Sequence, residues 1–116
     1  MPSLDTPVCD AETRRFNQEA SNLGEGVLIL TISNDLPFAQ KRYCAAEGID
    51  RVKVLSDYRG QLFGRAAGLF VKENYLLARA VIVADRLGVV RYLQIVPVSG
   101  QEPDYAPVLK AVRELL

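Results

Sequence analysis

The stretch VLILTIS, residues 27–33, is a continuous apolar run in which several side chains are branched at Cβ. This pattern is typical of a strand in a parallel sheet with helices on both faces, because neither face of such a strand meets water. It therefore predicts a buried strand over residues 27–33. The segments on either side of this strand decide the fold class.

The residues after this run, NDLPFAQKRYCAAEG, predict a helix. Asp35 is a candidate cap, Pro37 stands early in the helix and Gly48 ends it, so that Cys44 falls near its end. A short strand is expected next, over residues 52–55.

The residues before the run predict a helix from Pro7 to Asn22. Thr6 is its expected N-cap, a proline at the first helical position follows, and Gly24 supplies a stop. The apolar residues of this segment fall roughly on one face, as in an amphipathic helix.

The second half of the chain adds strands and a last helix. After a weak helical turn at 61–68, the stretch ARAVIVAD, 78–85, predicts a second buried strand. A short turn leads to an alternating segment at 89–97, which indicates an antiparallel hairpin. An amphipathic helix is expected over 103–116. This order of helices and strands belongs to the α/β class.

Composition limits the classes of function. The 116 residues suffice for one domain, and 49% hydrophobic with 24% charged residues is ordinary for a globular protein. Basic and acidic residues balance at 14 each, which argues against nucleic acid or an anionic membrane as a partner. The apolar runs are too short to span a bilayer, and the start lacks a signal-peptide pattern. We therefore expect a cytoplasmic protein.

The chain has no histidine, which excludes histidine bases, Ser-His triads and histidine-bound metals. Its two cysteines, Cys9 and Cys44, are too few for a structural zinc site. They lie 35 positions apart, so they form no C-x-x-C motif. Thiols are therefore the leading candidates for chemistry.

Cys9 is expected in the first turn of its helix, near free backbone N–H groups and the positive end of the helix dipole. Both features favour a thiolate, but a nearby arginine is needed as well. Arg14 and Arg15 are near in sequence, whereas Arg79 would have to arrive through the fold. The other interpretation is a small buried apolar residue, the commonest role of a lone cysteine.

The stretch PSLDTPVCD resembles the peroxiredoxin signature Pro-x-x-x-Thr/Ser-x-x-Cys, with Pro2, Thr6 and Cys9 in the matching positions. Three further segments resemble the bacterial atypical two-cysteine thiol peroxidases, the Tpx type: DLPFAQKRYCAAEG, LLARAVIVAD and EPDYAPVLKAV. The resemblance runs from Pro2 nearly to the end of the chain. It implies a thioredoxin-like α/β fold in a single domain, residues 1–116.

The resemblance also implies roles for five residues. Cys9 would be the peroxidatic cysteine, which a hydroperoxide oxidises to a sulfenic acid. Thr6 would bond the thiolate and the peroxide while it caps the helix, and Pro2 would shield the sulfur from water. Arg79 would polarise the O–O bond, unless it is a surface arginine at a strand end. Cys44 would resolve the sulfenic acid as an intramolecular disulfide.

The partners follow from the same resemblance. The substrates would be hydrogen peroxide and alkyl hydroperoxides, thioredoxin would be the reductant, and the chain would form a homodimer. No metal or organic cofactor is implied. Two alternatives remain open: a redox sensor or relay that uses the same oxidation, and a non-catalytic thioredoxin-like module.

The sequence departs from the family at its start. Family members carry an N-terminal hairpin and a central strand before the signature loop, and that strand lies between the strands expected at 27–33 and 78–85. We therefore expect an incomplete domain in which these two strands face a gap with unpaired edges. The chain could be part of a longer protein, a rearranged or oligomeric form that fills the gap, or a naturally short protein. Only the first leaves the enzyme assignment intact. The other two put activity in doubt, because the geometry of Thr6, Cys9 and Arg79 depends on that missing strand, and an inactive truncated fragment is then the alternative.

Overall fold

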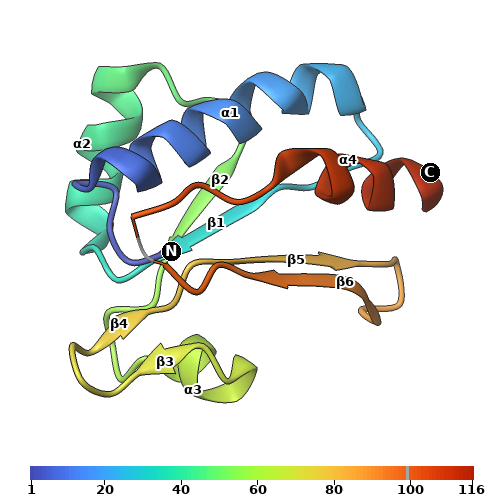
Figure 1. The fold of residues 1–116 in the computed structure, drawn as a ribbon. Coiled ribbons are helices and arrows are strands. Elements are labelled where there is room, and N and C mark those ends of the chain that lie inside the picture. The colour runs from blue at the N-terminus through green and yellow to red at the C-terminus, as the bar shows by residue number, and fades with distance from the viewer. Residues whose placement is uncertain (99) are drawn as a thin grey trace.

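The structure is a computed structural model that describes residues 1–98 and 100–116 (Figure 1). The helices are α1 (Pro7–Leu23), α2 (Pro37–Glu47), α3 (Leu62–Ala67) and α4 (Tyr105–Glu114). The strands are β1 (Leu30–Ser33), β2 (Lys53–Ser56), β3 (Phe70–Val71), β4 (Leu76–Leu77), β5 (Ala80–Ala84) and β6 (Val90–Ile95). No helix among the described residues is long and apolar enough to cross a membrane.

The described strands form three separate two-stranded sheets. β1 and β2 are parallel, in register from Leu30 opposite Lys53 to Ser33 opposite Ser56, and α2 makes the crossover between them. β5 and β6 form an antiparallel hairpin, and β3 pairs with β4 in a smaller one. The predicted α/β class and the hairpin after residue 78 are confirmed.

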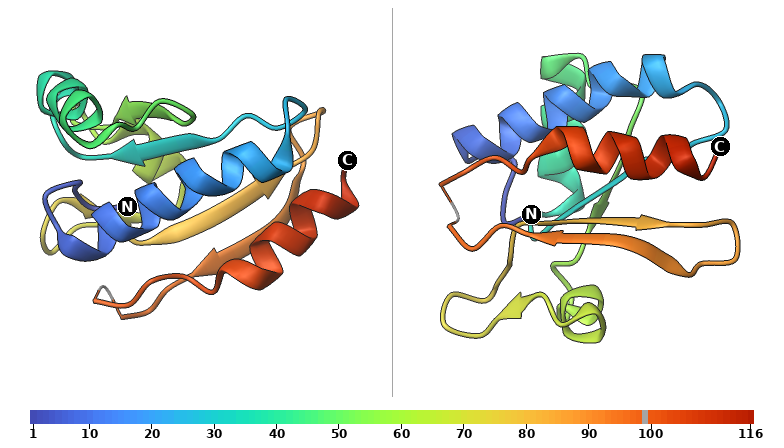
Figure 2. Two further views of the ribbon diagram at one scale, coloured as in Figure 1. Left: turned by 90° about the horizontal axis from the view of Figure 1, so that it is seen from above. Right: turned by 45° about the vertical axis from the view of Figure 1, so that its right-hand side comes forward.

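Helices α1 and α4 lie side by side on the same side of β5 and β6 (Figures 1 and 2). The rings of Phe16 on α1 and Tyr105 on α4 meet edge to face, with centroids 5.5 Å apart. α4 contacts both strands of the hairpin through a face that includes the buried Val108 and Leu109. These two helices therefore form one wall of the molecule.

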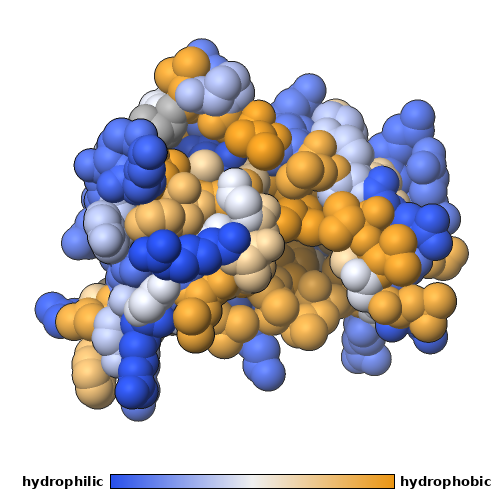
Figure 3. Space-filling model, turned by 90° about the horizontal axis from the view of Figure 1, so that it is seen from below, coloured by the Kyte–Doolittle hydropathy of each residue, from blue (hydrophilic) through white to orange (hydrophobic). Residues whose placement is uncertain are grey.

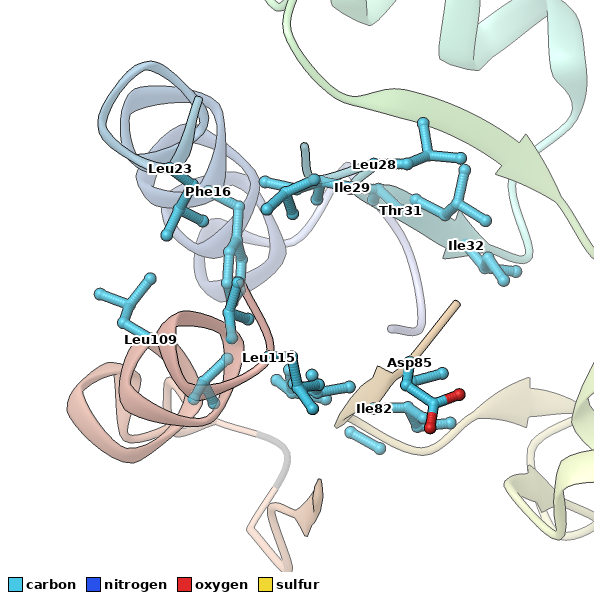
Figure 4. A pocket seen from close by; sticks show the side chains of 18 of the residues that line it. Phe16, Leu23, Leu28, Ile29, Thr31, Ile32, Ile82, Asp85, Leu109 and Leu115 are labelled. Carbon is cyan, nitrogen blue, oxygen red and sulfur yellow. The ribbon is translucent and has the colours of Figure 1, made fainter. Parts of the chain in front are cut away.

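A cavity of about 730 Å³ separates β1 from β5, and α1 and α4 close one side of it (Figure 4). Its lining is largely apolar: Phe16 and Leu23 from α1, Ile29 and Ile32 along β1, Ile82 from β5, and Leu109 and Leu115 along α4. From below, the space-filling view shows a hollow with mainly apolar walls (Figure 3). We call this cavity the β1–β5 groove. It confirms the expected gap between the two most hydrophobic strands.

The groove explains why one prediction is wrong. The strand expected over residues 27–33 begins only at Leu30, and it is not covered on both faces. Leu28 and Leu30 are 70% and 47% exposed. A strand with a neighbour along one edge only cannot bury its whole apolar run.

The helix cap expected at Asp35 is also wrong. The N-cap of α2 is Leu36, without a side-chain bond to the helix. The Asp35 carboxylate instead accepts hydrogen bonds from the loop before α1. Gly48 ends the helix as predicted, with φ of 67°.

Gly64 in α3 packs closely against Leu77 and Asp57, and a substitution tests this packing. A Cβ atom at this position would lie 2.8 Å from Leu77 Cδ2 and 3.2 Å from a carboxylate oxygen of Asp57. We expect Gly64→Ala to lower the free energy of unfolding by about 1–3 kcal/mol, because the added methyl group overpacks the site. Urea unfolding measures this change. Gly100→Ala, where a Cβ meets nothing within 4 Å, is the control, and equal effects of the two substitutions would contradict the prediction.

Candidate active site

The start of α1 places a thiol in the first helical turn. Thr6 adopts an extended N-cap conformation, and its Oγ1 accepts a hydrogen bond of 3.2 Å from Cys9 N. Pro7, which has no N–H to satisfy, takes the first helical position. The predicted cap, with Thr6 three residues before the cysteine, is confirmed as local structure.

The hydroxyl of Thr6 is held from its other side as well. It donates to the carbonyl oxygen of Ser3 at 3.0 Å, and the Thr6 backbone N–H donates to the same oxygen at 3.1 Å. Because its proton points to Ser3 and one lone pair takes the Cys9 N–H, the oxygen keeps a second lone pair that can accept a further hydrogen bond.

A buried arginine contacts this thiol. Cys9 is fully buried, and Arg79 Nη1 lies 3.3 Å from its Sγ. Arg79 directly precedes β5, so the fold brings it from 70 positions away. The same nitrogen bonds Glu12 Oε2 at 2.9 Å, and the side chains of Arg79 and Glu12 are only 1% and 3% exposed. The guanidinium is therefore shared between a thiol and a carboxylate.

The electrostatics of this pair follow from burial. Burial raises the pKa of Glu12, against the lowering effect of its hydrogen bond from Arg79. Burial also acts to lower the pKa of Arg79, but its bonds to Cys9 and Glu12 outweigh this and raise it. Arg79 therefore remains a cation next to the thiol.

Sequence reasoning missed Glu12. The signal that could have found it is its spacing, because a residue three positions after Cys9 lies on the same face of a helix. A cation that reaches one of these side chains is placed to reach the other.

The two arginines that are near Cys9 in sequence point elsewhere. Arg14 pairs with Asp10 at 3.0 Å and with Glu47 on α2. Arg15 pairs with Glu19 at 3.0 Å. The cation at the thiol thus comes from the fold rather than from the helix that carries the cysteine.

Cys44 lies in the last turn of α2 and is half-buried, and both cysteines are free thiols. Its carbonyl oxygen accepts hydrogen bonds from the N–H groups of Gly48 and Ile49, which close the end of the helix. Burial raises the pKa of the Cys44 thiol. Its role as the resolving cysteine stays a prediction.

Polar side chains join the helices that carry the two cysteines. Tyr43 Oη on α2 donates to Asp10 on α1 at 2.5 Å, and Arg14 links Asp10 to Glu47. We call these four residues the α1–α2 clasp. A large movement of Cys44 towards α1 has to break or rearrange it.

Pro2 lies in the loop before α1. Its carbonyl oxygen accepts a hydrogen bond of 3.1 Å from Asn34 N, and Met1 N donates to Ile32 O at 2.9 Å. The loop is thus attached to the end of β1. The role of Pro2 as a shield for the sulfur stays a prediction.

The raised pKa of Cys44 predicts how its reactivity depends on pH. In a Cys9→Ser variant, the rate of alkylation by iodoacetamide is expected to keep rising above about pH 9, where a free cysteine with a pKa of about 8.5 levels off. The sign follows because burial disfavours the thiolate. The same variant unfolded in urea is the control. Coincident pH profiles of the native and unfolded chains would contradict the prediction.

A buried thiol in the first turn of a helix, bonded by a buried arginine on an α/β fold of this kind, is the arrangement expected of a thiol-based redox protein. The profile of the family described as Redoxin matches residues 1–109. The chain belongs to this family and, within it, to the peroxiredoxins of the thiol peroxidase type, a class of peroxidases.

Named relatives agree with this assignment. A thiol peroxidase of Bacillus subtilis (strain 168) is 51% identical over 116 residues, which are 100% of this chain and 69% of the relative. A thiol peroxidase of Listeria monocytogenes (strain EGD-e) is 47% identical over 114 residues, 98% of this chain and 68% of the relative. The chain thus spans about two thirds of the length of these relatives.

Solved structures give the same fold. A peroxiredoxin-like protein from Aquifex aeolicus superposes with a TM-score of 0.92 at 43% identity, over 100% of this chain and 68% of that one. AhpC of Enterococcus faecalis superposes with a TM-score of 0.85 at 20% identity, over 98% of this chain and 70% of that one, and supports the fold alone. The thioredoxin-like peroxiredoxin fold is therefore confirmed.

Proposed function

We propose that this chain reduces hydrogen peroxide and alkyl hydroperoxides through Cys9, and that a dithiol protein of the thioredoxin type regenerates it. The observation that carries the proposal is the contact of 3.3 Å between Arg79 Nη1 and Cys9 Sγ in a fully buried setting. A cation bonded to the sulfur can stabilise the negative charge on the thiolate, which is the nucleophile in this chemistry.

In the first step, the Cys9 thiolate attacks the terminal oxygen of the hydroperoxide. An S–O bond forms, the O–O bond breaks, and water or an alcohol leaves after it takes up a proton. Cys9 becomes a sulfenic acid. Arg79 stabilises the negative charge that moves to the leaving oxygen. Thr6 Oγ1 accepts a hydrogen bond from the peroxide hydroxyl, because its own proton is held by Ser3 O.

In the second step, the Cys44 thiolate attacks the sulfur of the sulfenic acid. The S–S bond forms, the S–O bond breaks, and hydroxide leaves and takes up a proton to become water. The half-buried Cys44 must first leave the last turn of α2, and the α1–α2 clasp must open. Two electrons from the dithiol partner then return both cysteines to thiols by exchange.

We also propose that the chain associates with a second copy of itself and acts in the cytoplasm. Exposed apolar residues at the start of α2, Leu36 and Phe38, support an association surface. A reducing compartment keeps both thiols available for turnover. Sedimentation velocity of the chain, with Phe38→Ser as the comparison, tests the association, and a monomer at all concentrations would contradict it.

The decisive experiment measures oxidation of reduced thioredoxin in the presence of hydrogen peroxide. The wild-type chain should turn over, Cys9→Ser should not, and Cys44→Ser should form the sulfenic acid once but lose disulfide-linked turnover. Oxidation of the chain without turnover would indicate a sensor or relay instead. A wild-type chain that leaves peroxide unreduced while both cysteines stay reduced would contradict the proposed function.

A further inference from the structure

The carboxylate of Asp35 connects the end of β1 to the loop before α1. It accepts hydrogen bonds from Ser3 Oγ at 2.6 Å, Leu4 N at 2.8 Å and Ser33 Oγ at 2.7 Å. Leu4 and Ser33 are buried, so two of the three donors come from the protein interior. Hydrogen bonds to an ionised acceptor are about twice as strong as neutral ones. This carboxylate can therefore hold the loop before α1 firmly against the end of β1.

The loop that Asp35 holds is the loop that orients Thr6. Ser3 donates its hydroxyl proton to Asp35, and its carbonyl oxygen accepts both the N–H and the hydroxyl proton of Thr6. The Thr6 oxygen in turn accepts the N–H of Cys9. A continuous series of hydrogen bonds therefore runs from Asp35 through Ser3 and Thr6 to the first turn of α1.

We propose that Asp35 is a positioning residue for the reaction of Cys9, acting through Ser3 and Thr6. It fixes the Ser3 carbonyl so that the Thr6 hydroxyl proton points away from the thiol and the acceptor side of its oxygen faces the site. The inference rests on the proposed function, in which Thr6 accepts a hydrogen bond from the peroxide.

Asparagine at position 35 has the same shape as aspartate but lacks its charge and its second acceptor oxygen. With the amide oxygen turned to Leu4 N and Ser33 Oγ, the NH₂ group faces Ser3 Oγ, which must then accept a hydrogen bond instead of donating one. All three bonds become neutral and weaker, so the loop is held less firmly. A displacement of about 1 Å in a reacting geometry costs up to about 10²-fold in rate.

The test measures Cys9 in a Cys44→Ser background, where it is the only thiol. Stopped-flow kinetics give the rate of sulfenic acid formation with hydrogen peroxide, and iodoacetamide gives the rate of alkylation. Asp35→Asn and Ser3→Ala should each slow the peroxide step by about 10–100-fold. Alkylation, which needs no hydrogen bond from the peroxide to Thr6, should change less than about 3-fold, well below the change in the peroxide step. The double variant should be no slower than Asp35→Asn alone, because both changes act on one series of bonds.

Asp57→Asn is the matched control. Asp57 is buried, and its carboxylate likewise accepts backbone hydrogen bonds, from Phe63 N at 2.9 Å and Gly64 N at 2.8 Å at the start of α3. This substitution loosens a carboxylate anchor outside the Thr6–Cys9 series, so it should lower stability and leave the peroxide step unchanged.

Three results would overturn the proposal. The first is a peroxide step that Asp35→Asn leaves unchanged. The second is a variant in which alkylation of Cys9 becomes faster while the peroxide step becomes slower. That result would mean that the substitution loosens the fold and exposes the buried thiol, rather than misplacing Thr6. The third is additive losses in the double variant. If the wild-type chain itself fails to react with peroxide, the proposed function fails, and hydrogen exchange of the Cys9 amide decides the positioning role. Faster exchange in both variants supports it, and unchanged exchange overturns it.

Discussion

Reaction with hydrogen peroxide is expected to be about 10²–10³-fold slower in an Arg79→Met variant than in the wild-type chain. Arg79 Nη1 lies 3.3 Å from the Cys9 sulfur, and the guanidinium side chain is buried there. Methionine fills similar space but donates no hydrogen bond and carries no charge. Stopped-flow measurement of sulfenic acid formation, in a Cys44→Ser background, gives the rate constant.

Two further variants separate charge from geometry. Arg79→Lys keeps a cation but not the rigid, planar guanidinium that holds Nη1 against both Cys9 and Glu12, so its rate should fall between those of wild type and Arg79→Met. Arg91→Met is the control, because Arg91 is an exposed arginine on β6 paired with Asp85. If Arg79→Met reacted as fast as wild type, Arg79 would serve only as a partner of Glu12.

The second large effect is on stability. At pH 7, Arg79→Met should lower the free energy of unfolding by about 3–5 kcal/mol, because it leaves the Glu12 carboxylate buried without its partner. The side chains of the pair are 1% and 3% exposed, so water cannot replace the lost contact without opening the fold. Urea unfolding monitored by circular dichroism measures the difference.

The deficit should depend on pH in a defined direction. Burial raises the pKa of Glu12, and Arg79→Met removes the hydrogen bond that opposes this. The pKa of a glutamate in the unfolded chain is about 4.3. If its pKa is higher in the folded chain, the folded protein loses stability as pH rises above that unfolded value. The deficit should therefore shrink on acidification towards about pH 4.3. Adding Glu12→Gln should recover stability at pH 7 and flatten the profile, and an equal deficit at both pH values would count against this account.

Much of the fold could be predicted because its signals are local. Thr6 and Pro7 define the start of α1, and the apolar or alternating runs define β5 and β6. The β3–β4 hairpin escaped because two-residue strands have no periodicity to detect. The prediction of Asp35 as a cap was wrong because two of its three donors, Ser3 and Leu4, lie more than thirty positions away.

In the candidate site too, contacts between residues near in sequence could be predicted and contacts between distant residues could not. The capping bond between Thr6 and Cys9 spans three residues, so the sequence predicts it. The contact of Arg79 with the thiol spans 70 positions, and family resemblance rather than any local pattern pointed to it. Glu12 could have been predicted from helical spacing, because it lies three positions after Cys9, but it was missed. The roles of Pro2 and Cys44 need chemical tests, because a reduced structure shows neither shielding from water nor a disulfide.

The β1–β5 groove has a consequence for how the chain behaves in concentrated solution. On the groove side, no strand among the described residues pairs with the edges of β1 and β5, which lie between apolar side chains. Such edges are templates for strand addition between molecules. Light scattering per unit mass should therefore increase with protein concentration, and protein should be lost from solution. Scattering per unit mass that stays constant would argue against strand addition. Colloidal stability, rather than redox chemistry, would then set the concentration range in which the reactions proposed above can be measured.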